Sequence, residues 1–199
     1  MRCLVFMMKL ILTFSAALTL SLMTGCSQFI AAASGPDLVG VNDGERTLSQ
    51  RVEDISIEKT ASINFYKLNP GFRDAHVSVM SFYSNVLIAG QVPSAELSRV
   101  AESSTQSMRE VKSVHNELTI GEPSPYLTRV QDSVISARVS SKLTFAKGFP
   151  SSQCKVLVED SVVYLMAKLK KADADKAEQL IRQIPEVSKL VKLIDYIPE

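Results

Sequence analysis

The sequence predicts an α+β fold made of two copies of one unit, each with a small mixed sheet covered by two helices. The first observation is a repeat, because the segment 85–92 resembles the segment 162–169, with Val86 and Val163 lying 77 residues apart. The second is that both copies show the same order of periodic segments, which is helix, strand, strand, helix, strand. A hairpin and one further strand beneath two helices form a two-layer α+β unit.

The first copy begins with an amphipathic helix, predicted over residues 47–62. Leu48, Val52 and Ile55 recur at helical spacing, and Pro70-Gly71 marks the loop that follows. The first helix is therefore expected before the hairpin.

The hairpin and the second helix of this copy follow from local patterns. Apolar and polar residues alternate over 76–82, and Tyr83-Ser84-Asn85 supplies a turn into the strand that contains Val86. Pro93-Ser94 favours the start of a second helix, and the segment 113–120 has the pattern of a closing strand. The second copy repeats the order, with helices predicted at 126–145 and 173–184 and strands at 155–159, 162–169 and 187–196.

The N-terminal 25 residues have the two parts of a secretory signal peptide. A basic start with Arg2 and Lys9 precedes an apolar run over 10–23, which is too short to span a bilayer as a helix. The following Met23-Thr24-Gly25-Cys26 resembles the lipobox of bacterial lipoproteins. This resemblance implies that residues 1–25 are removed and that Cys26 is acylated, the alternative being an ordinary signal with an accidental cysteine.

The expected location follows from the residue after the cysteine. By the rule known for enteric lipoproteins, an Asp at position 27 retains a protein in the inner membrane, and this chain has Ser27. The resemblance therefore implies an outer-membrane lipoprotein that faces the periplasm. Residues 26–45 are rich in Ala, Ser, Gly and Asp, so a lipidated flexible tether is expected before the fold.

The repeat also has a family resemblance. The element order, the 77-residue period and the segment Leu87-Ile88-Ala89-Gly90-Gln91-Val92 resemble the BON domain family. The resemblance implies two tandem BON domains, at 46–121 and 124–199. The glycine of the middle strand is Gly90 in the first copy and Ala167 in the second, so a relaxed backbone is expected at Ala167 if the family position needs a positive φ.

Charge and cysteine content limit the function classes. The chain has 22 basic and 21 acidic residues, a balance that argues against nucleic-acid binding as its role. Only residues 126–199 are biased toward an anionic partner, with 12 basic and 9 acidic residues. Cys154 has no intrachain mate once Cys26 is acylated, so it is either a small buried strand residue or a free thiol.

No constellation for catalysis, cofactor or metal binding is found in the sequence. There is no nucleophile elbow and no glycine loop for phosphate, so a non-enzymatic protein is expected. His76 and His115 lie in predicted strands and lack a third ligand. The acids at positions 173, 175 and 178 suit the first turns of a helix, because carboxylates interact favourably with the helix dipole there.

The helix predicted over 126–145 has two apolar stripes on nearly opposite sides. One stripe contains Ile135, Val139 and Leu143 and can face the sheet. The other contains Leu127, Val130, Val134 and Ala137, with Phe145 one turn later. Basic residues flank it, and Lys168, Lys170 and Lys171 are expected nearby. Apolar residues rimmed by cations are typical of a helix that enters the headgroup zone of an anionic membrane. The candidate phospholipid-binding residues are Leu127, Val130, Val134, Arg138, Lys142, Phe145 and Lys147.

The family resemblance implies the same function, because the first helix of the second BON domain is the part associated with anionic phospholipids such as phosphatidylglycerol. The family's lipid-facing aromatic falls near Val134 here, so weaker affinity is expected. The resemblance also implies support of outer-membrane integrity and links to envelope proteins at division sites, in outer-membrane protein assembly and in amidase regulation. Two alternatives stay open: the second stripe packs against the first domain, or the chain is a protein adaptor that recognises no lipid.

Overall fold

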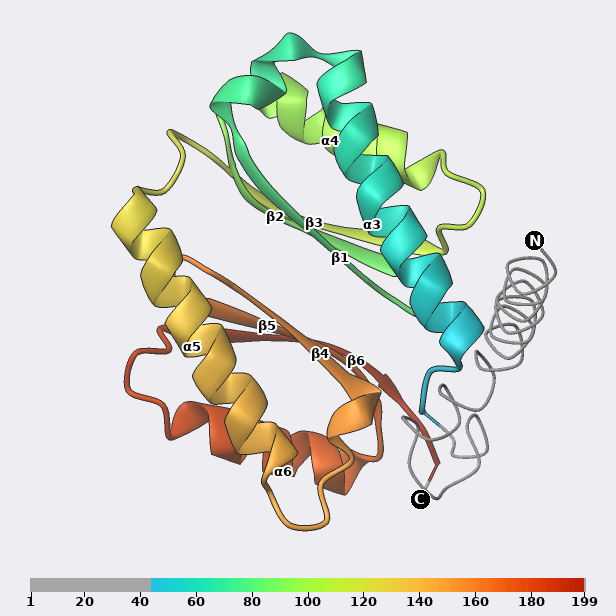
Figure 1. Cartoon of the computed structure of the whole chain (residues 1–199), viewed down its shortest axis with the longest axis vertical. Helices are drawn as coiled ribbons and strands as arrows, with labels where there is room; N and C mark the ends of the chain where they lie inside the picture. Colours follow the sequence, from blue (N-terminus) through green and yellow to red (C-terminus); the bar gives the residue numbers. More distant parts are fainter. Residues whose placement is uncertain (1–43, 199) are drawn as a thin grey trace, which may run out of the picture. The chain divides into compact units, whose positions relative to one another are not determined.

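The computed structural model describes residues 44–198, which contain two units of identical element order (Figure 1). The predicted signal peptide, the predicted acylation site at Cys26 and nearly all of the predicted tether lie outside the described residues. The first unit contains α3 (Leu48–Leu68), the 3-10 helix η1 (Pro70–Asp74), β1 (His76–Phe82), β2 (Asn85–Val92), α4 (Ala95–Gln106) and β3 (Ser113–Ile120). The second contains α5 (Tyr126–Thr144), η2 (Ser151–Gln153), β4 (Cys154–Glu159), β5 (Val162–Leu169), α6 (Lys171–Arg182) and β6 (Lys189–Tyr196).

Each unit has a three-stranded mixed sheet, of order β1-β2-β3 in the first and β4-β5-β6 in the second. The middle strand pairs antiparallel with its hairpin partner and parallel with the last strand, in registers that include Val86 opposite Val114 and Val163 opposite Leu190. Parallel neighbours need a crossover, which α4 and α6 supply. The predicted α+β class is confirmed.

The helix boundaries differ from the predicted ones in two places. The first helix begins as expected, since Thr47 and Gln50 form a capping box, but it continues to Leu68. It extends because Phe65 continues the buried helical spacing, and it ends shortly before Pro70. The helix α6 begins and ends two residues earlier than the predicted 173–184.

The apolar residues whose spacing predicts α3 do not meet the sheet. Leu48, Val52 and Ile55, whose spacing predicted the helix, are all exposed. The residues buried under the helix are Asp54, Ile57, Ala61 and Phe65. A polar side chain thus takes one of the core positions, and the more regular apolar stripe faces outward.

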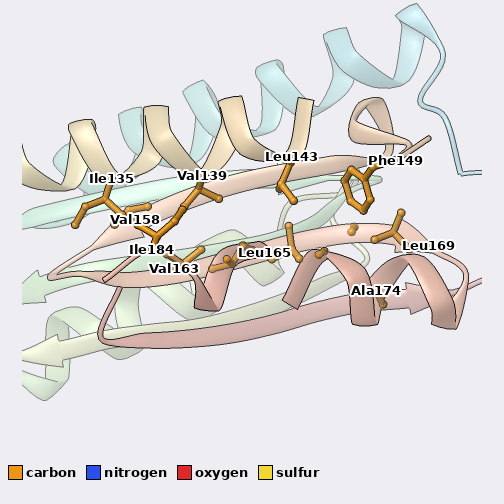
Figure 2. Packing of buried hydrophobic residues seen from close by; sticks show 13 residues of the cluster. Ile135, Val139, Leu143, Phe149, Val158, Val163, Leu165, Leu169, Ala174 and Ile184 are labelled. Atoms are coloured by element: carbon orange, nitrogen blue, oxygen red, sulfur yellow. The ribbon is translucent and has the colours of Figure 1, made fainter. Parts of the chain in front are cut away.

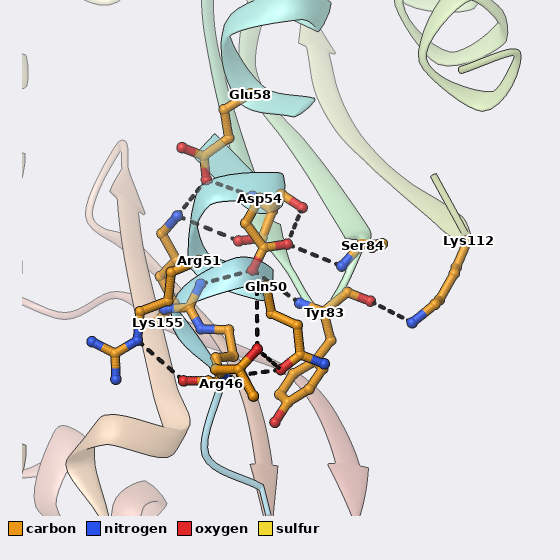
Figure 3. Close-up of polar contacts among 11 residues, drawn as sticks. Arg46, Gln50, Arg51, Asp54, Glu58, Tyr83, Ser84, Lys112 and Lys155 are labelled. Atoms are coloured by element: carbon orange, nitrogen blue, oxygen red, sulfur yellow. Dashed lines mark hydrogen bonds and ion pairs between the residues drawn. The ribbon is translucent and has the colours of Figure 1, made fainter. Parts of the chain in front are cut away.

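Asp54 is buried because it binds the tip of the hairpin between β1 and β2 (Figure 3). Tyr83 and Ser84 occupy the turn with φ of 54° and 64°, and their amides donate to the Asp54 carboxylate at 3.2 and 3.0 Å. Ser81 Oγ and Arg46 Nη1 donate to the same carboxylate at 2.7 and 2.8 Å. The first turn of α3 and the hairpin tip are therefore fixed to each other.

Asp132 of α5 makes the equivalent contact in the second unit. It is 5 % exposed, and its two carboxylate oxygens accept the amides of Asp160 at 3.0 Å and Ser161 at 2.8 Å. These turn residues also have positive φ, of 50° and 60°. The repeat thus preserves a buried acid that satisfies two turn amides, which a tight hairpin would otherwise leave without partners.

Each unit has its own apolar core between the sheet and its helices. In the second unit, Ile135, Val139 and Leu143 of α5 pack on Val163 and Leu165 of β5 (Figure 2). Corresponding positions of α3 and β2 fill the first core, where Phe65 stacks on Phe72 with ring centroids 5.2 Å apart. The core stripe predicted for the helix at 126–145 is therefore confirmed.

The opposite faces of the two sheets pack against each other and form a third apolar cluster, here called the seam. It buries six residues, four from β1 and β2 and two from β5. These are Met80, Phe82, Leu87, Ala89, Tyr164 and Met166. Burial, with nearby Glu117, Glu159 and Asp160, raises the pKa of Tyr164 to about 12. The alternative in which Val130 and Val134 form the interdomain contact is wrong, because both are exposed.

Polar contacts surround the seam. Gln91 Nε2 donates to Asp160 at 2.9 Å, and Ser124 joins both, through its amide to Gln91 and through its hydroxyl to Asp160. Glu58 of α3 and Lys155 of β4 form an ion pair across the two units (Figure 3). These bonds fix the short connection between β3 and α5.

The glycine difference between the copies has a structural cause. Gly90 has φ of +123°, and a Cβ there would overlap the carbonyl oxygen of His76. Ala167 is not among the positive-φ residues of the described chain, so its backbone has the ordinary extended geometry that a side chain allows. The relaxed geometry expected at Ala167 is therefore present.

Candidate functional site

The helix α5 presents a second apolar face to solvent. Its core face contains Ile135, Val139 and Leu143, while Val130 is 41 % exposed and Val134 is 47 % exposed. Both ends of the helix are more open, since Leu127 is 73 % exposed and Phe145 is 86 % exposed. Apolar side chains that are contiguous and rimmed by charge mark an interaction surface more often than scattered ones do.

A shallow groove of about 690 Å³ lies between this face and α6. Val134, Phe145 and Leu180 supply its apolar lining, and Arg138 and Lys142 bring cations to it. The groove thus brings together four of the seven candidate residues, Val134, Arg138, Lys142 and Phe145. Leu127 and Val130 extend the surface toward the start of the helix, and Lys147 follows its end.

The cations of this surface are only partly neutralised. Arg138 pairs with Glu186, an exposed contact whose energetic value is small. The pKa of Glu186 is lowered, mainly because the carboxylate accepts a hydrogen bond from the Glu186 backbone amide and, to a smaller extent, because it contacts Arg138. Lys142 and Lys147 form no ion pair with any residue in the range 44–198, so positive charge remains available to an anion.

The lysines expected near this surface lie elsewhere. The ammonium of Lys168 lies 5.1 Å from the ring centroid of Tyr83, in the first unit. Lys171 pairs with Asp175 within α6, and neither it nor Lys170 lines the groove. The basic rim is therefore supplied by the helix itself.

Several other polar groups singled out in the sequence have structural partners. His76 Nε2 lies 3.1 Å from Glu159, whereas His115 is on β3, separated from β1 by the middle strand. Glu178 is held by Lys192 and Arg182, which lower its pKa. Among the described residues, no group of three or more His, Cys, Asp or Glu side chains is placed to hold a metal ion.

Cys154 begins β4 and is a half-buried free thiol packed against the second core. Burial, with a smaller contribution from Asp173, raises the pKa of this thiol to about 12. A thiol with such a pKa is protonated at neutral pH and reacts slowly. Both features indicate a structural residue.

Sequence reasoning missed several notable residues. Tyr126 is 71 % exposed and supplies an aromatic at the start of α5, close to Leu127. Asp54 and Asp132 were missed too, although an acid at the same place in two repeated apolar patterns was a usable signal.

No helix within residues 44–198 has both the length and the apolar character needed to cross a bilayer.

The fold and the surface define a small repeat protein with two α+β units and one solvent-facing apolar, basic helix. The sequence model of the BON domain matches residues 60–122 and 131–198. The chain therefore belongs to the BON domain family and contains two of its domains.

Two related proteins cover most of the chain. One is described as a 21 kDa hemolysin of Actinobacillus pleuropneumoniae, 28% identical over 152 residues, or 76% of this chain and 78% of the relative. The other is described as the outer membrane lipoprotein DolP of Haemophilus influenzae, 26% identical over 165 residues, or 83% of this chain and 81% of the relative.

Among solved structures, the chain is similar to the C-terminal domain of CdsD, a structural protein of the type III secretion system of Chlamydia trachomatis. The identity is 17%, and the match covers 73% of this chain and 67% of that one with a TM-score of 0.29. A TM-score this low does not establish a common overall arrangement.

Proposed function

We propose that this protein is a non-enzymatic, lipid-anchored component of the outer membrane that faces the periplasm and binds anionic phospholipid through α5. Phosphatidylglycerol is the expected ligand class, and maintenance of outer-membrane integrity is the expected role. The relative from Haemophilus influenzae, which is described as an outer membrane lipoprotein, supports this location.

The observation that carries the proposal is the outward face of α5. Its large apolar side chains are 41–86 % exposed, and Arg138, Lys142 and Lys147 rim them. Such a helix lies in the headgroup region, where apolar burial and attraction to anionic lipid act together.

The anchor at Cys26 would complement this helix. One acyl chain gives only marginal membrane binding, so firm attachment needs several chains or a second contact. A lipidated N-terminus would keep the protein at the bilayer, and α5 would then select regions rich in anionic lipid.

Liposome co-sedimentation tests the lipid recognition. The chain from residue 27 onward, which lacks the acylated cysteine, is mixed with vesicles of phosphatidylethanolamine alone or with phosphatidylglycerol added. Binding is expected only with phosphatidylglycerol, weaker at high salt because headgroup attraction is screened. The Val134→Glu variant should lose this binding.

Ile120→Glu is the matched control, because Ile120 is 64 % exposed on β3 of the first unit and lies outside the α5 surface. It should bind as the parent chain does. Absence of binding at low salt, or equal loss in both variants, would contradict lipid recognition by α5. A protein adaptor would then be the better function.

The anchor has a separate test. Mass spectrometry of the protein purified from membranes should give an N-terminal peptide that begins at Cys26 and carries the mass of its acyl chains. An unmodified N-terminus would contradict the lipoprotein assignment.

A further inference from the structure

A second apolar surface lies on α3 of the first unit. It consists of Leu48, Val52, Ile55, Ile63 and Tyr66, here called the outer stripe, and each of these residues is 52–59 % exposed. At 100° per residue the five lie within an arc of about 80°, opposite the buried face of the helix. The stripe runs along most of the 21 residues of α3, or about 30 Å.

The outer stripe has no cover among residues 44–198. The core face of α3 is filled by Ile57, Ala61 and Phe65, so the stripe does not contribute to the first core. Five large apolar residues in one row exceed the scattered exposure that is normal on a soluble surface. An external partner is therefore required to explain it.

We infer that the outer stripe of α3 is a second membrane-contact surface, used by the anchored protein together with α5. This inference rests on the proposed function, because it takes the bilayer at Cys26 as the partner. The inference adds a membrane contact from the first unit, where α3 has no groove lined by cations like the one beside α5.

The position of α3 in the chain favours the bilayer as occupant. Leu48 follows Cys26 by 22 residues, so a flexible tether would hold the start of α3 at a root-mean-square distance of roughly 26 Å from the anchor. At that distance the local concentration of bilayer is high, and even a weak apolar contact is populated.

The packing of the two units places α3 and α5 on one side of the molecule. The helix α3 packs over the edge strand β1, and α5 packs over the edge strand β4. These edges meet, because Ser78 of β1 donates to Glu159 of β4 at 3.2 Å and Lys155 of β4 pairs with Glu58 of α3. The two helices therefore flank the same edge of the packed sheets.

A second copy of the chain fits the outer stripe less well than a bilayer does. Lys59 is exposed in the middle of the stripe, so antiparallel pairing of two α3 helices would bring two ammonium groups together. At a membrane, the same lysine can extend its head to the phosphates while its stem stays apolar. Five half-exposed side chains also supply only a few hundred Å², below the roughly 800 Å² per partner of a standard interface.

Site-specific fluorescence on the full lipidated protein tests this inference. Ile55→Cys is made in a Cys154→Ala background and labelled with an environment-sensitive dye, and the protein is placed in phosphatidylethanolamine–phosphatidylglycerol vesicles. Val134→Cys reports on α5, and Ser103→Cys, exposed on α4, reports on a water-facing position. Nitroxide-labelled lipid should quench the dye at position 55 at least twofold more than the dye at position 103.

The outcomes separate this inference from the proposed function. One outcome is strong quenching of the dye at position 134, with the dye at position 55 quenched no more than the dye at position 103. This result would overturn the α3 contact and leave the α5 contact standing. Quenching at 55 alone would support the α3 contact and contradict the α5 contact. A spectral shift at 55 that is lost on tenfold protein dilution, without lipid quenching, would assign the stripe to a second copy and overturn the inference.

Discussion

At the scale of single residues, the Asp54 carboxylate accepts hydrogen bonds from four residues, Arg46, Ser81, Tyr83 and Ser84. Burial alone would raise the pKa of its carboxyl, but hydrogen bonds from Ser81, Ser84 and Arg46 outweigh that effect and lower the pKa below 3.8. The Asp54 side chain thus connects Arg46, which precedes α3, to the helix α3 and to the tip of the hairpin between β1 and β2.

Replacing Asp54 by Asn should destabilise the protein by roughly 2–4 kcal/mol at pH 7, because it removes a buried charge partner of Arg46 and weakens the bonds to the turn amides. Since the folded-state pKa is depressed, this contribution is present above pH 3.8 and is lost as the pH falls toward the lowered pKa. Urea unfolding at several pH values measures it. The difference between the parent protein and the variant should shrink below pH 3.8.

The matched variant is Asp132→Asn, which removes the same turn contact but, among the described residues, breaks no ion pair. It should be destabilising by a smaller amount. A larger effect at Asp132 than at Asp54, or no pH dependence of the difference at Asp54, would contradict this account of the hairpin contact.

Gly90→Ala should be among the most damaging small substitutions in the first unit. The added methyl group meets the His76 carbonyl, and φ of +123° is strained for any side chain, so a loss of about 2 kcal/mol or more is expected. The opposite change, Ala167→Gly, should cost no more than about 1 kcal/mol. Thermal unfolding of both variants compares them, and equal losses would show that the copies share one backbone geometry.

At the scale of secondary structure, local sequence patterns predicted the α-helices and strands of the described units but neither of the 3-10 helices η1 and η2. Helix ends were less predictable. The helix α3 continues beyond the predicted end because residues at helical spacing stay buried as far as Phe65, and no helix-breaking residue occurs before Pro70. Alternation in 76–82 and the continuous apolar run in 85–92 correctly located β1 and β2. Local patterns are informative here because each element is short and bounded by a turn residue or a cap.

The face of each element was harder to predict. In α3 the stripe with regular apolar spacing faces outward, while the core face includes Asp54, which no hydropathy pattern marks as buried. The seam was also missed, although the middle strands β2 and β5 are apolar at nearly every position. Such runs are typical of strands buried on both faces.

The candidate site was predictable only in part. Spacing alone separated the two stripes of α5, and the structure places the second stripe in solvent. The groove with Leu180 depends on where α6 packs, which the sequence does not specify. The position of Lys168 over Tyr83 likewise depends on the seam.

The two stripes of α5 should respond differently to charge. Val139→Glu places a carboxylate in a position with no exposure and should cost more than about 4 kcal/mol. Val134→Glu lies in solvent and should change stability by less than about 0.5 kcal/mol. Denaturant unfolding of the two variants measures this difference. A strongly destabilised Val134→Glu would also invalidate it as a variant for the lipid test.

At the scale of the whole molecule, the seam makes the two units one body. Both sheets are covered by helices on one face and by each other on the second face. Met80, Phe82 and Met166 are almost fully buried there. Either unit alone would therefore expose apolar side chains of the seam to water.

Met166→Asp should therefore uncouple the units. A buried carboxylate in the seam favours separation, so denaturant unfolding should change from one transition to two, with the weaker unit unfolding first. Tyr196→Asp is the control, since Tyr196 is 55 % exposed on β6. A single transition in Met166→Asp at unchanged midpoint would mean that the seam contributes little to cooperativity.

The seam also has a consequence for biosynthesis. The second copy follows the first by 77 residues, so a chain that emerges N-terminus first completes the first domain before the second. Until the second domain emerges, the outer side of the first sheet, with Phe82 and Leu87, is exposed. A chaperone that covers this side of the sheet until the second domain emerges would protect the chain from misassembly with neighbouring copies.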